Sequence, residues 1–218
     1  MADNQQNQQV GRRARNMRAK QSRIFEVAAQ LFAERGFAAV TTQQISDRAD
    51  IAAGTLFRYA SSKGQLLLMV YNEDFRSAFE TGTRRARDIA DPVGAITALL
   101  RPILVAAARN TENTIAYQRE LLFGPPEETY REQGLVLVAQ LESVLAEILL
   151  TAVADSGEPT AAQREAARVA GRSLFAVLHM ALVRPSTGVH PHHDPIADLH
   201  AQIAQLVAGF RSVAVSGI

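Results

Sequence analysis

The residues best suited to do chemistry lie between Thr41 and Lys63. Thr55, Arg58 and Tyr59 can donate hydrogen bonds to phosphates or base edges, and Lys63 can bind a phosphate at a helix start. Small residues just before them would let the backbone enter a DNA major groove, which is about 12 Å wide. This spacing favours DNA binding. An ordinary helical hairpin, which also contains small residues and caps, is the alternative.

A second candidate is a histidine cluster, His190, His192 and His193, because imidazole is a common metal ligand. The neighbours are prolines and a glycine, and such a loop rarely holds ligands rigidly without supporting hydrogen bonds. We therefore expect a solvated loop and no metal site. His179, on an apolar stretch, is expected to fill the core or line a pocket.

Signatures of enzymes are missing from the sequence. No glycine-rich phosphate loop is present, and Gly171-Arg172-Ser173 lacks the closing glycine of a nucleophile elbow. The carboxylates are scattered over polar faces of the expected helices, and cysteine is absent. We expect no catalytic residues and no cofactor.

Composition and charge indicate a globular protein with a basic front. The chain has 218 residues, 47% hydrophobic and 21% charged, with net charge +1. Up to residue 63 there are ten Lys/Arg against five Asp/Glu, whereas the remainder has thirteen against seventeen. This asymmetry points to a polyanionic partner for the front alone. No targeting segment is recognised and the apolar run 173–183 is too short for a bilayer, so we expect a cytoplasmic protein without membrane contact.

Four helices are expected in the first part of the chain. Apolar residues recur at helical spacing from Arg18 until Gly36, and a short helix capped by Thr41 follows. After a tight turn at Asp50, a third helix is expected over residues 52–59 and a fourth from Ser62 to Arg87, each of the last two beginning with small or capping residues.

The remainder also shows only helical periodicity. Amphipathic stretches follow Pro92 and are separated by turn signals at residues 124–126 and 157 and by a Pro/Gly/His loop at 185–195. No alternating strand pattern of useful length is found. The fold class is all-α.

Several fixed spacings within residues 22–67 carry a resemblance to a known family. They are Ile24-x-x-x-Ala28-x-x-Leu31-Phe32-x-x-x-Gly36-Phe37, Thr41-x-x-x-Ile45, Gly54-Thr55-Leu56-Phe57-Arg58-Tyr59 and Ser62-Lys63-x-x-Leu66-Leu67. Together they resemble the DNA-binding domain of TetR-family transcriptional regulators. The resemblance implies a homodimer with an N-terminal three-helix helix-turn-helix domain, which binds a double-stranded operator. A larger helical domain, which binds a small effector and dimerises, would follow.

The resemblance and the basic residues before it define the predicted DNA-contacting set. Its members are Arg18, Arg23, Thr41, Thr42, Gln43, Ala53, Gly54, Thr55, Phe57, Arg58, Tyr59 and Lys63. Three positions depart from the family's pattern. Phe57 replaces a tyrosine and so loses a phosphate hydrogen bond, Ala60 replaces a phenylalanine of the core, and Asp50 places an acid where glycine is common.

The predicted organisation has three parts. Residues 1–17 form a disordered basic arm, which either contacts DNA or is a free tail. Residues 18–66 form the DNA-binding domain, with the helix-turn-helix at about 42–61, and residues 67–218 form the effector-binding and dimerisation domain.

Two further sets of residues are predicted in the C-terminal domain. The effector site is expected to use Met69, Arg101, Tyr117, Phe175 and His179, as an apolar cavity with few polar anchors. The dimer interface is expected on the apolar stripes of the last two helices, at Leu174, Leu178, Leu199, Ile203, Leu206 and Phe210.

The sequence thus predicts a ligand-responsive repressor that binds a palindromic operator as a homodimer and is released by a small, largely apolar effector. An all-helical dimeric metabolite-binding or interaction protein, without specific DNA binding, is the alternative. An enzyme with an unrecognised helical site is a second one.

Overall fold

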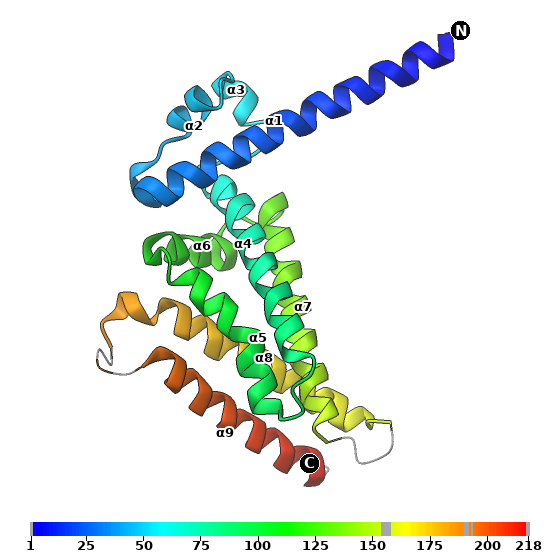
Figure 1. Cartoon of the computed structure of the whole chain (residues 1–218), viewed down its shortest axis with the longest axis vertical. Helices are drawn as coiled ribbons and strands as arrows, with labels where there is room; N and C mark the ends of the chain where they lie inside the picture. Colours follow the sequence, from blue (N-terminus) through cyan, green and yellow to red (C-terminus); the bar gives the residue numbers. More distant parts are fainter. Residues whose placement is uncertain (1, 154–157, 190–191, 193, 217–218) are drawn as a thin grey trace.

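A computed structural model describes the backbone of residues 2–153, 158–189, 192 and 194–216, and the side chains of this part from residue 15 to residue 214. The described residues form nine helices and no strand, as the periodicity predicted. The helices are α1 (Ala2–Ala39), α2 (Thr42–Arg48), α3 (Ala53–Leu56), α4 (Lys63–Ala86), α5 (Pro92–Ala107), α6 (Thr111–Phe123), α7 (Thr129–Thr151), α8 (Ala161–Thr187) and α9 (Pro195–Ser216). Figure 1 shows α1 to α3 at one end of the molecule and a larger helical bundle below them.

The N-terminal helices form where the sequence placed their signals. Thr41 begins α2 with a capping box: its hydroxyl accepts from the Gln44 amide at 3.2 Å, and the Gln44 side chain accepts from the Thr41 amide at 3.0 Å. Asp50 takes a positive φ of 51° in the turn before α3, the conformation that the sequence suggested for it.

The third helix is shorter than expected. It covers only Ala53–Leu56, and residues 57–59 continue it as turns in which Arg58 and Tyr59 donate to the carbonyls three residues earlier. Such i→i+3 bonds tighten the last turn of a helix and close it early. The Ser62 hydroxyl then caps α4, but Gln65 does not complete a capping box, since its side chain accepts from the Tyr130 amide instead.

Residues 2–17 of the predicted arm lie in the first part of a long helix. α1 begins at Ala2 and runs past the other helices as a projecting rod (Figure 1). The segment contains no proline and is rich in Gln, Arg and Ala, which propagate a helix well once it is nucleated. Nucleation comes from the buried residues Ile24, Ala28 and Phe32 of the same helix. Helical φ/ψ stops at Gly36, where φ is 76°.

The larger bundle is assembled around α4, which packs along α5 and also touches α6 and α7. Helices α4 and α5 approach each other closely at Gly82, where a Cβ atom would overlap the Leu99 carbonyl oxygen. At its N-terminal end, α4 shares a core with α1 to α3, through Leu66, Leu67 and Leu68. The two parts of the chain are therefore joined by one continuous helix.

Helices α7 and α8 are long and apolar enough to cross a membrane by length and composition, with mean hydropathies of 1.7 and 1.4 over their most apolar windows. The bent pair formed by α5 and α6 passes the same test if it is treated as one broken span. In the bundle, Leu141, Leu145 and Leu149 of α7 face Leu174 and Leu178 of α8 within one core. Apolar side chains of α7 and α8 are thus buried in the core of the bundle.

The histidine loop lies mostly beyond the description. His190 and His193 are outside the described residues, and His192 is exposed. Within the described part of the chain, no group of three His, Asp or Glu residues is placed to hold a metal ion.

Candidate functional site

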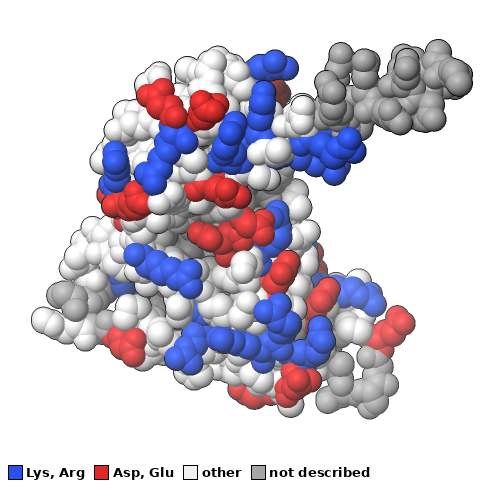
Figure 2. Space-filling model, turned by 45° about the horizontal axis from the view of Figure 1, so that its top comes forward, with Lys and Arg blue, Asp and Glu red and all other residues white. Residues whose placement is uncertain are grey.

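The predicted DNA-contacting residues gather at the end of the molecule formed by α1 to α3. Arg18, Arg23, Gln43, Gly54 and Arg58 are exposed there. The remaining members of the set are exposed (Thr41, Phe57) or half-buried (Thr42, Ala53, Thr55, Tyr59, Lys63). Figure 2 shows several Lys and Arg side chains over this end, interspersed with Asp and Glu, and a further row of basic side chains lower on the bundle.

A groove separates α1 from α3 on this surface. It has a volume of about 320 Å³ and is lined by Asn16, Met17 and Lys20 of α1 and by Thr55, Arg58 and Tyr59 after the turn. Three residues predicted to contact DNA thus face Lys20 of α1 across this groove.

Two of the predicted contacts have other partners in the free protein. The Gln43 amide donates to Asp47 Oδ1 at 2.7 Å. Lys63 Nζ donates to the carbonyls of Phe37 and Val40, both at 2.9 Å, and to that of Ala38 at 3.4 Å. The ammonium also lies 4.3 Å from the centre of the Phe37 ring. All three donors of Lys63 therefore close the end of α1, where a cation is favoured by the free carbonyls.

Side chains of α6 form hydrogen bonds with the same end of α1. Asn113 is fully buried, donates to the Phe32 carbonyl at 2.8 Å and accepts from the Phe37 amide at 2.6 Å. The neighbouring Glu112 accepts from the Ala38 amide at 2.7 Å. This pair replaces the hydrogen bonds that the break at Gly36 removes from the helix.

A second chain of hydrogen bonds crosses between α6, α4 and α7. Tyr117 donates to Asn72 Oδ1 at 2.9 Å, and Asn72 donates to the Tyr130 carbonyl at 2.7 Å. The Tyr130 amide donates to Gln65 Oε1 at 3.1 Å, and the Tyr130 hydroxyl accepts from Gln21 of α1 at 3.3 Å. These bonds, which are buried except for the one from Gln21, connect the centre of the bundle to α1.

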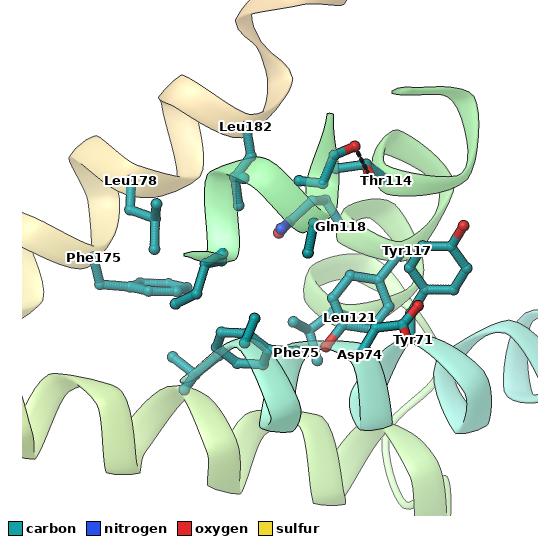
Figure 3. Close-up of a pocket in the computed structure, with 15 residues that line it drawn as sticks. Tyr71, Asp74, Phe75, Thr114, Tyr117, Gln118, Leu121, Phe175, Leu178 and Leu182 are labelled. Carbon is teal, nitrogen blue, oxygen red and sulfur yellow. Dashed lines mark hydrogen bonds between the residues drawn. The ribbon is translucent and has the colours of Figure 1, made fainter. Parts of the chain in front are cut away.

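Tyr117 is also part of the wall of a cavity inside the bundle. The cavity has a volume of about 50 Å³ and lies between α4, α5, α6, α7 and α8. Its lining residues are Tyr71, Asp74, Phe75, Ala78, Ile103, Ala106, Ala107, Thr114, Tyr117, Gln118, Leu121, Val138, Phe175, Leu178 and Leu182. Figure 3 shows side chains of α4, α6 and α8 converging on this space.

The five predicted effector residues divide between the cavity and other places. Tyr117 and Phe175 line it. Met69 is buried in the core shared with α1, and Arg101 is exposed on the outside of α5, so the structure removes both from this cavity. His179 lies behind Phe175, with ring centres 6.3 Å apart, and does not line the cavity.

The missed lining residues carry a signal that the sequence contains. On α4 they are Tyr71, Asp74, Phe75 and Ala78, and on α6 they are Thr114, Gln118 and Leu121, which join the predicted Tyr117. Both sets follow the spacing i, i+3, i+4, i+7, which marks one face of a helix. Two such faces that combine aromatic and polar residues with apolar ones indicate a wall rather than a uniform core.

Burial shifts the acid–base behaviour of the cavity walls. It raises the pKa of the Tyr117 hydroxyl and that of Tyr71, so both stay neutral. Burial also raises the pKa of the Asp74 carboxyl, with nearby Arg109 opposing it. The pKa of His179 is lowered by burial, and its Nδ1 is buried with no hydrogen-bond partner among the described residues.

Most of the residues predicted for the dimer interface are buried within the single chain. Leu174, Leu178, Leu199, Ile203 and Phe210 are at most 4% exposed and belong to the core of their own chain. Leu206 is half-buried and lies in an outward groove between α8 and α9. The sequence shows that α8 and α9 carry apolar stripes. In the structure, the stripe with the larger apolar residues of each helix faces the core of its own chain.

The outward groove between α8 and α9 is one apolar surface of the described part of the chain. It is lined by small and apolar residues, including Ala166, Val169, Ala170, Gly209 and Val213, and has a volume of about 520 Å³. Val169 and Val213 are 51% and 43% exposed. Small residues let helices approach closely, so this face suits packing against other helices.

Comparison with known proteins agrees with this arrangement. Residues 24–70 match the family described as bacterial regulatory proteins, tetR family. The HTH-type transcriptional repressor KstR of Mycobacterium tuberculosis is 30% identical over 152 residues, 70% of this chain and 66% of that repressor. The chain thus spans just under two thirds of the length of this relative. KstR of Rhodococcus jostii is 27% identical over 69% of this chain and 66% of its own length.

Solved structures share the fold. FadR of Thermus thermophilus, a TetR-family repressor solved with lauroyl-CoA, superposes with a TM-score of 0.66 at 24% identity, covering 86% of this chain and 93% of FadR. RolR, solved with resorcinol, gives a TM-score of 0.64 at 19% identity, covering 92% and 95%. From its helix-turn-helix, its family match and its relatives, the chain belongs to the TetR family of bacterial transcriptional regulators.

Proposed function

We propose that this protein is a homodimeric repressor that binds operator DNA through α3 and its surroundings and releases it when a small, largely apolar molecule enters the bundle cavity. The observation that carries the proposal is the position of Tyr117. Its ring lines the cavity, and its hydroxyl begins the hydrogen bonds that reach Gln65 and Gln21 beside the DNA-facing helices.

We assign DNA recognition to contacts with base edges, to contacts with phosphates and to the basic surface of the N-terminal helix. Arg58 and Thr55 border the groove beside α3 and reach base edges, while Arg18 and Lys20 bind phosphates. The helical arm extends this basic surface, which lengthens the electrostatic contact with the duplex. In the free protein Lys63 is occupied by carbonyls, so we assign it to holding α1 against α4.

Dimerisation is assigned to the groove between α8 and α9. Two copies related by a two-fold axis would bring four helices together, with Val169 and Leu206 of each copy at the seam. Such a dimer places two copies of α3 in successive major grooves if they are about 34–36 Å apart. The proposed location is the cytoplasm, where operator DNA is available.

Release follows from a shift between two bundle conformations. At about 50 Å³ the cavity is narrow, so a ligand larger than a few waters must displace α6 or α8. Displacement of α6 would disturb both the Tyr117–Asn72 bond and the Asn113 contacts with α1. A ligand that favours the open bundle would then favour an altered separation of the two α3 helices.

The test uses the purified protein and the DNA upstream of its own gene, measured by fluorescence anisotropy against unrelated DNA of the same length. We expect specific binding, and loss of base discrimination in Arg58→Ala but not in Arg211→Ala, a matched change on the exposed side of α9. Lauroyl-CoA and resorcinol, the ligands in related structures, serve as first probes of release. Equal affinity for both DNAs would overturn the proposal.

The dimer has its own test. Val169→Asp should give a folded monomer by sedimentation and lose operator affinity, because a charge on this face prevents close packing of helices. Ile203→Asp is the control: this residue is fully buried in its own chain, so the variant should unfold rather than dissociate. A folded, dimeric Val169→Asp variant would place the interface elsewhere.

A further inference from the structure

Gln118 of α6 is the unusual residue of the cavity wall. It is 8% exposed, and its Oε1 atom is buried without a hydrogen-bond partner among the described residues. Figure 3 shows its side chain pointing from α6 into the cavity, towards Leu178 and Leu182 of α8. Burying an unpaired amide oxygen against apolar side chains is unfavourable by itself.

The other buried polar groups of the wall have partners within the chain. The Thr114 hydroxyl donates to the Ala107 carbonyl at 2.8 Å, and the Tyr117 hydroxyl donates to Asn72 at 2.9 Å. The Tyr71 ring packs against that of Tyr117, with ring centres 5.9 Å apart. Among the described wall residues, Gln118 is thus the one with a buried side-chain polar atom that has no hydrogen-bond partner.

The rest of the wall restricts the charge of that ligand. No Lys or Arg belongs to the lining residues, and the single ionisable carboxyl group among them is Asp74. A carboxylate or phosphate entering this space would lose its hydration, find no cation in the wall and face an acid. Aromatic rings from α4 and α8, Phe75 and Phe175, together with leucines, instead suit a flat apolar body.

We infer that the effector is an uncharged, mainly apolar alcohol or phenol whose hydroxyl pairs with the Gln118 amide. A hydroxyl donates to Oε1, and it equally accepts from Nε2 if the amide turns over, so it satisfies Gln118 in either orientation. A ketone or ester oxygen satisfies only one of them. This inference rests on the proposed role of the cavity as the effector site and adds the chemical class of the ligand.

The experiment compares three probes of nearly equal shape: 2-naphthol, 2-methylnaphthalene and 2-naphthoate. Each is titrated calorimetrically into the full-length wild-type protein and into Gln118→Leu. Because a methyl group gains more than a hydroxyl from leaving water, the decisive quantity is the affinity ratio of 2-naphthol to 2-methylnaphthalene. We expect this ratio to fall at least about fivefold in Gln118→Leu, the loss of one buried hydrogen bond. 2-Naphthoate should bind at least roughly tenfold more weakly than 2-naphthol.

Thr114→Val is the matched control, since Thr114 lines the same cavity but its hydroxyl is already paired. It should change the ratio by less than about twofold. A ratio that is unchanged in Gln118→Leu, tight binding of 2-naphthoate, or no binding of either neutral probe up to its solubility limit overturns the inference. Operator binding is measured on the same preparations, so these outcomes remain distinct from a failure of the proposed repressor function.

Discussion

The two ends of this molecule are built on opposite principles. In the DNA-facing part, the core is filled by side chains such as Ile24, Phe32, Ile45 and Leu56, all without measurable exposure. The bundle has a core of similar leucines, yet it keeps a cavity whose wall includes the buried, unpaired oxygen of Gln118. A DNA-binding surface requires a fixed shape, which a fully packed core provides. A ligand-binding domain requires a cavity that the ligand can occupy.

Specific hydrogen bonds join the bundle to the N-terminal helices. Asn113 and Glu112 hold the end of α1, and Asn72 joins Tyr117 to Tyr130. Buried hydrogen-bond networks of this kind have few alternative arrangements that satisfy every group. A small movement of α6 therefore has a definite consequence for α1 and α4.

The largest effect expected from this contrast concerns two phenylalanines. Phe32→Ala removes a fully buried ring from the DNA-facing core and should lower the free energy of unfolding by about 3–5 kcal/mol. Phe175→Ala enlarges a cavity that already exists and should cost less, about 1–2 kcal/mol. Urea unfolding of both variants checks the difference. Equal losses would show that the cavity wall is packed as firmly as the core.

A somewhat smaller effect is expected where the two parts meet. Asn113→Leu leaves the Phe32 carbonyl and the Phe37 amide without partners and should cost about 2–3 kcal/mol. It should also weaken the response of operator binding to ligand, because α6 no longer grips α1. Gln133→Leu, an exposed change on α7, is the control and should alter neither quantity. Full ligand response in a folded Asn113→Leu variant would assign the coupling to α4 alone.

Lys63 separates the structural from the DNA-binding role of a single cation. With its ammonium bound to three carbonyls, Lys63→Ala should lower the free energy of unfolding by about 1 kcal/mol and leave the salt dependence of DNA binding unchanged. Lys20→Ala is the comparison, since Lys20 is exposed beside the groove. It should keep stability and reduce the slope of log affinity against log salt by roughly one. A reduced slope in Lys63→Ala would show that Lys63 exchanges its carbonyls for a phosphate on DNA.

Local signals predicted most of the fold, because they act over a few residues. The capping box at Thr41, the positive φ of Asp50 and the helical periodicity are all properties of neighbouring positions. The sequence could not show which of two apolar stripes on α8 and α9 faces inward, since both are made of similar residues. That choice depends on how α5 and α7 fill the space, as the burial of Leu174 and Ile203 shows.

The candidate sites show the same limit. Arg58 and Thr55 were placed from a motif and lie on the expected surface, beside the groove that α1 forms with α3. Lys63 was assigned a phosphate, but its carbonyl partners come from Phe37 and Val40, more than twenty residues away. The cavity lies between five helices, so its position depends on how these helices pack together. The types of single residues, such as Met69 and Arg101, do not indicate that packing.

The smallest effect that we expect concerns pH, and it belongs to the bundle alone. All five histidines follow residue 178, so the DNA-facing part contains none. Burial lowers the pKa of His179, and its Nδ1 has no partner among the described residues. Between this lowered pKa and the usual value of about 6.5, the unfolded chain binds more protons than the folded one, so stability falls as the pH falls through this range.

His179→Gln should therefore remove part of the stability loss between about pH 7.5 and pH 5.5, in proportion to the lowered pKa. The change should stay below about 0.5 kcal/mol, because the ring is half-buried and solvent screens its charge. Urea unfolding at the two pH values measures it, and His192→Gln, a change at an exposed loop position, should keep the wild-type dependence. If His179→Gln behaved like His192→Gln, the acid sensitivity would arise from a group other than His179. Asp74 is not that group, because its raised pKa makes the folded state bind more protons and so favours folding as the pH falls.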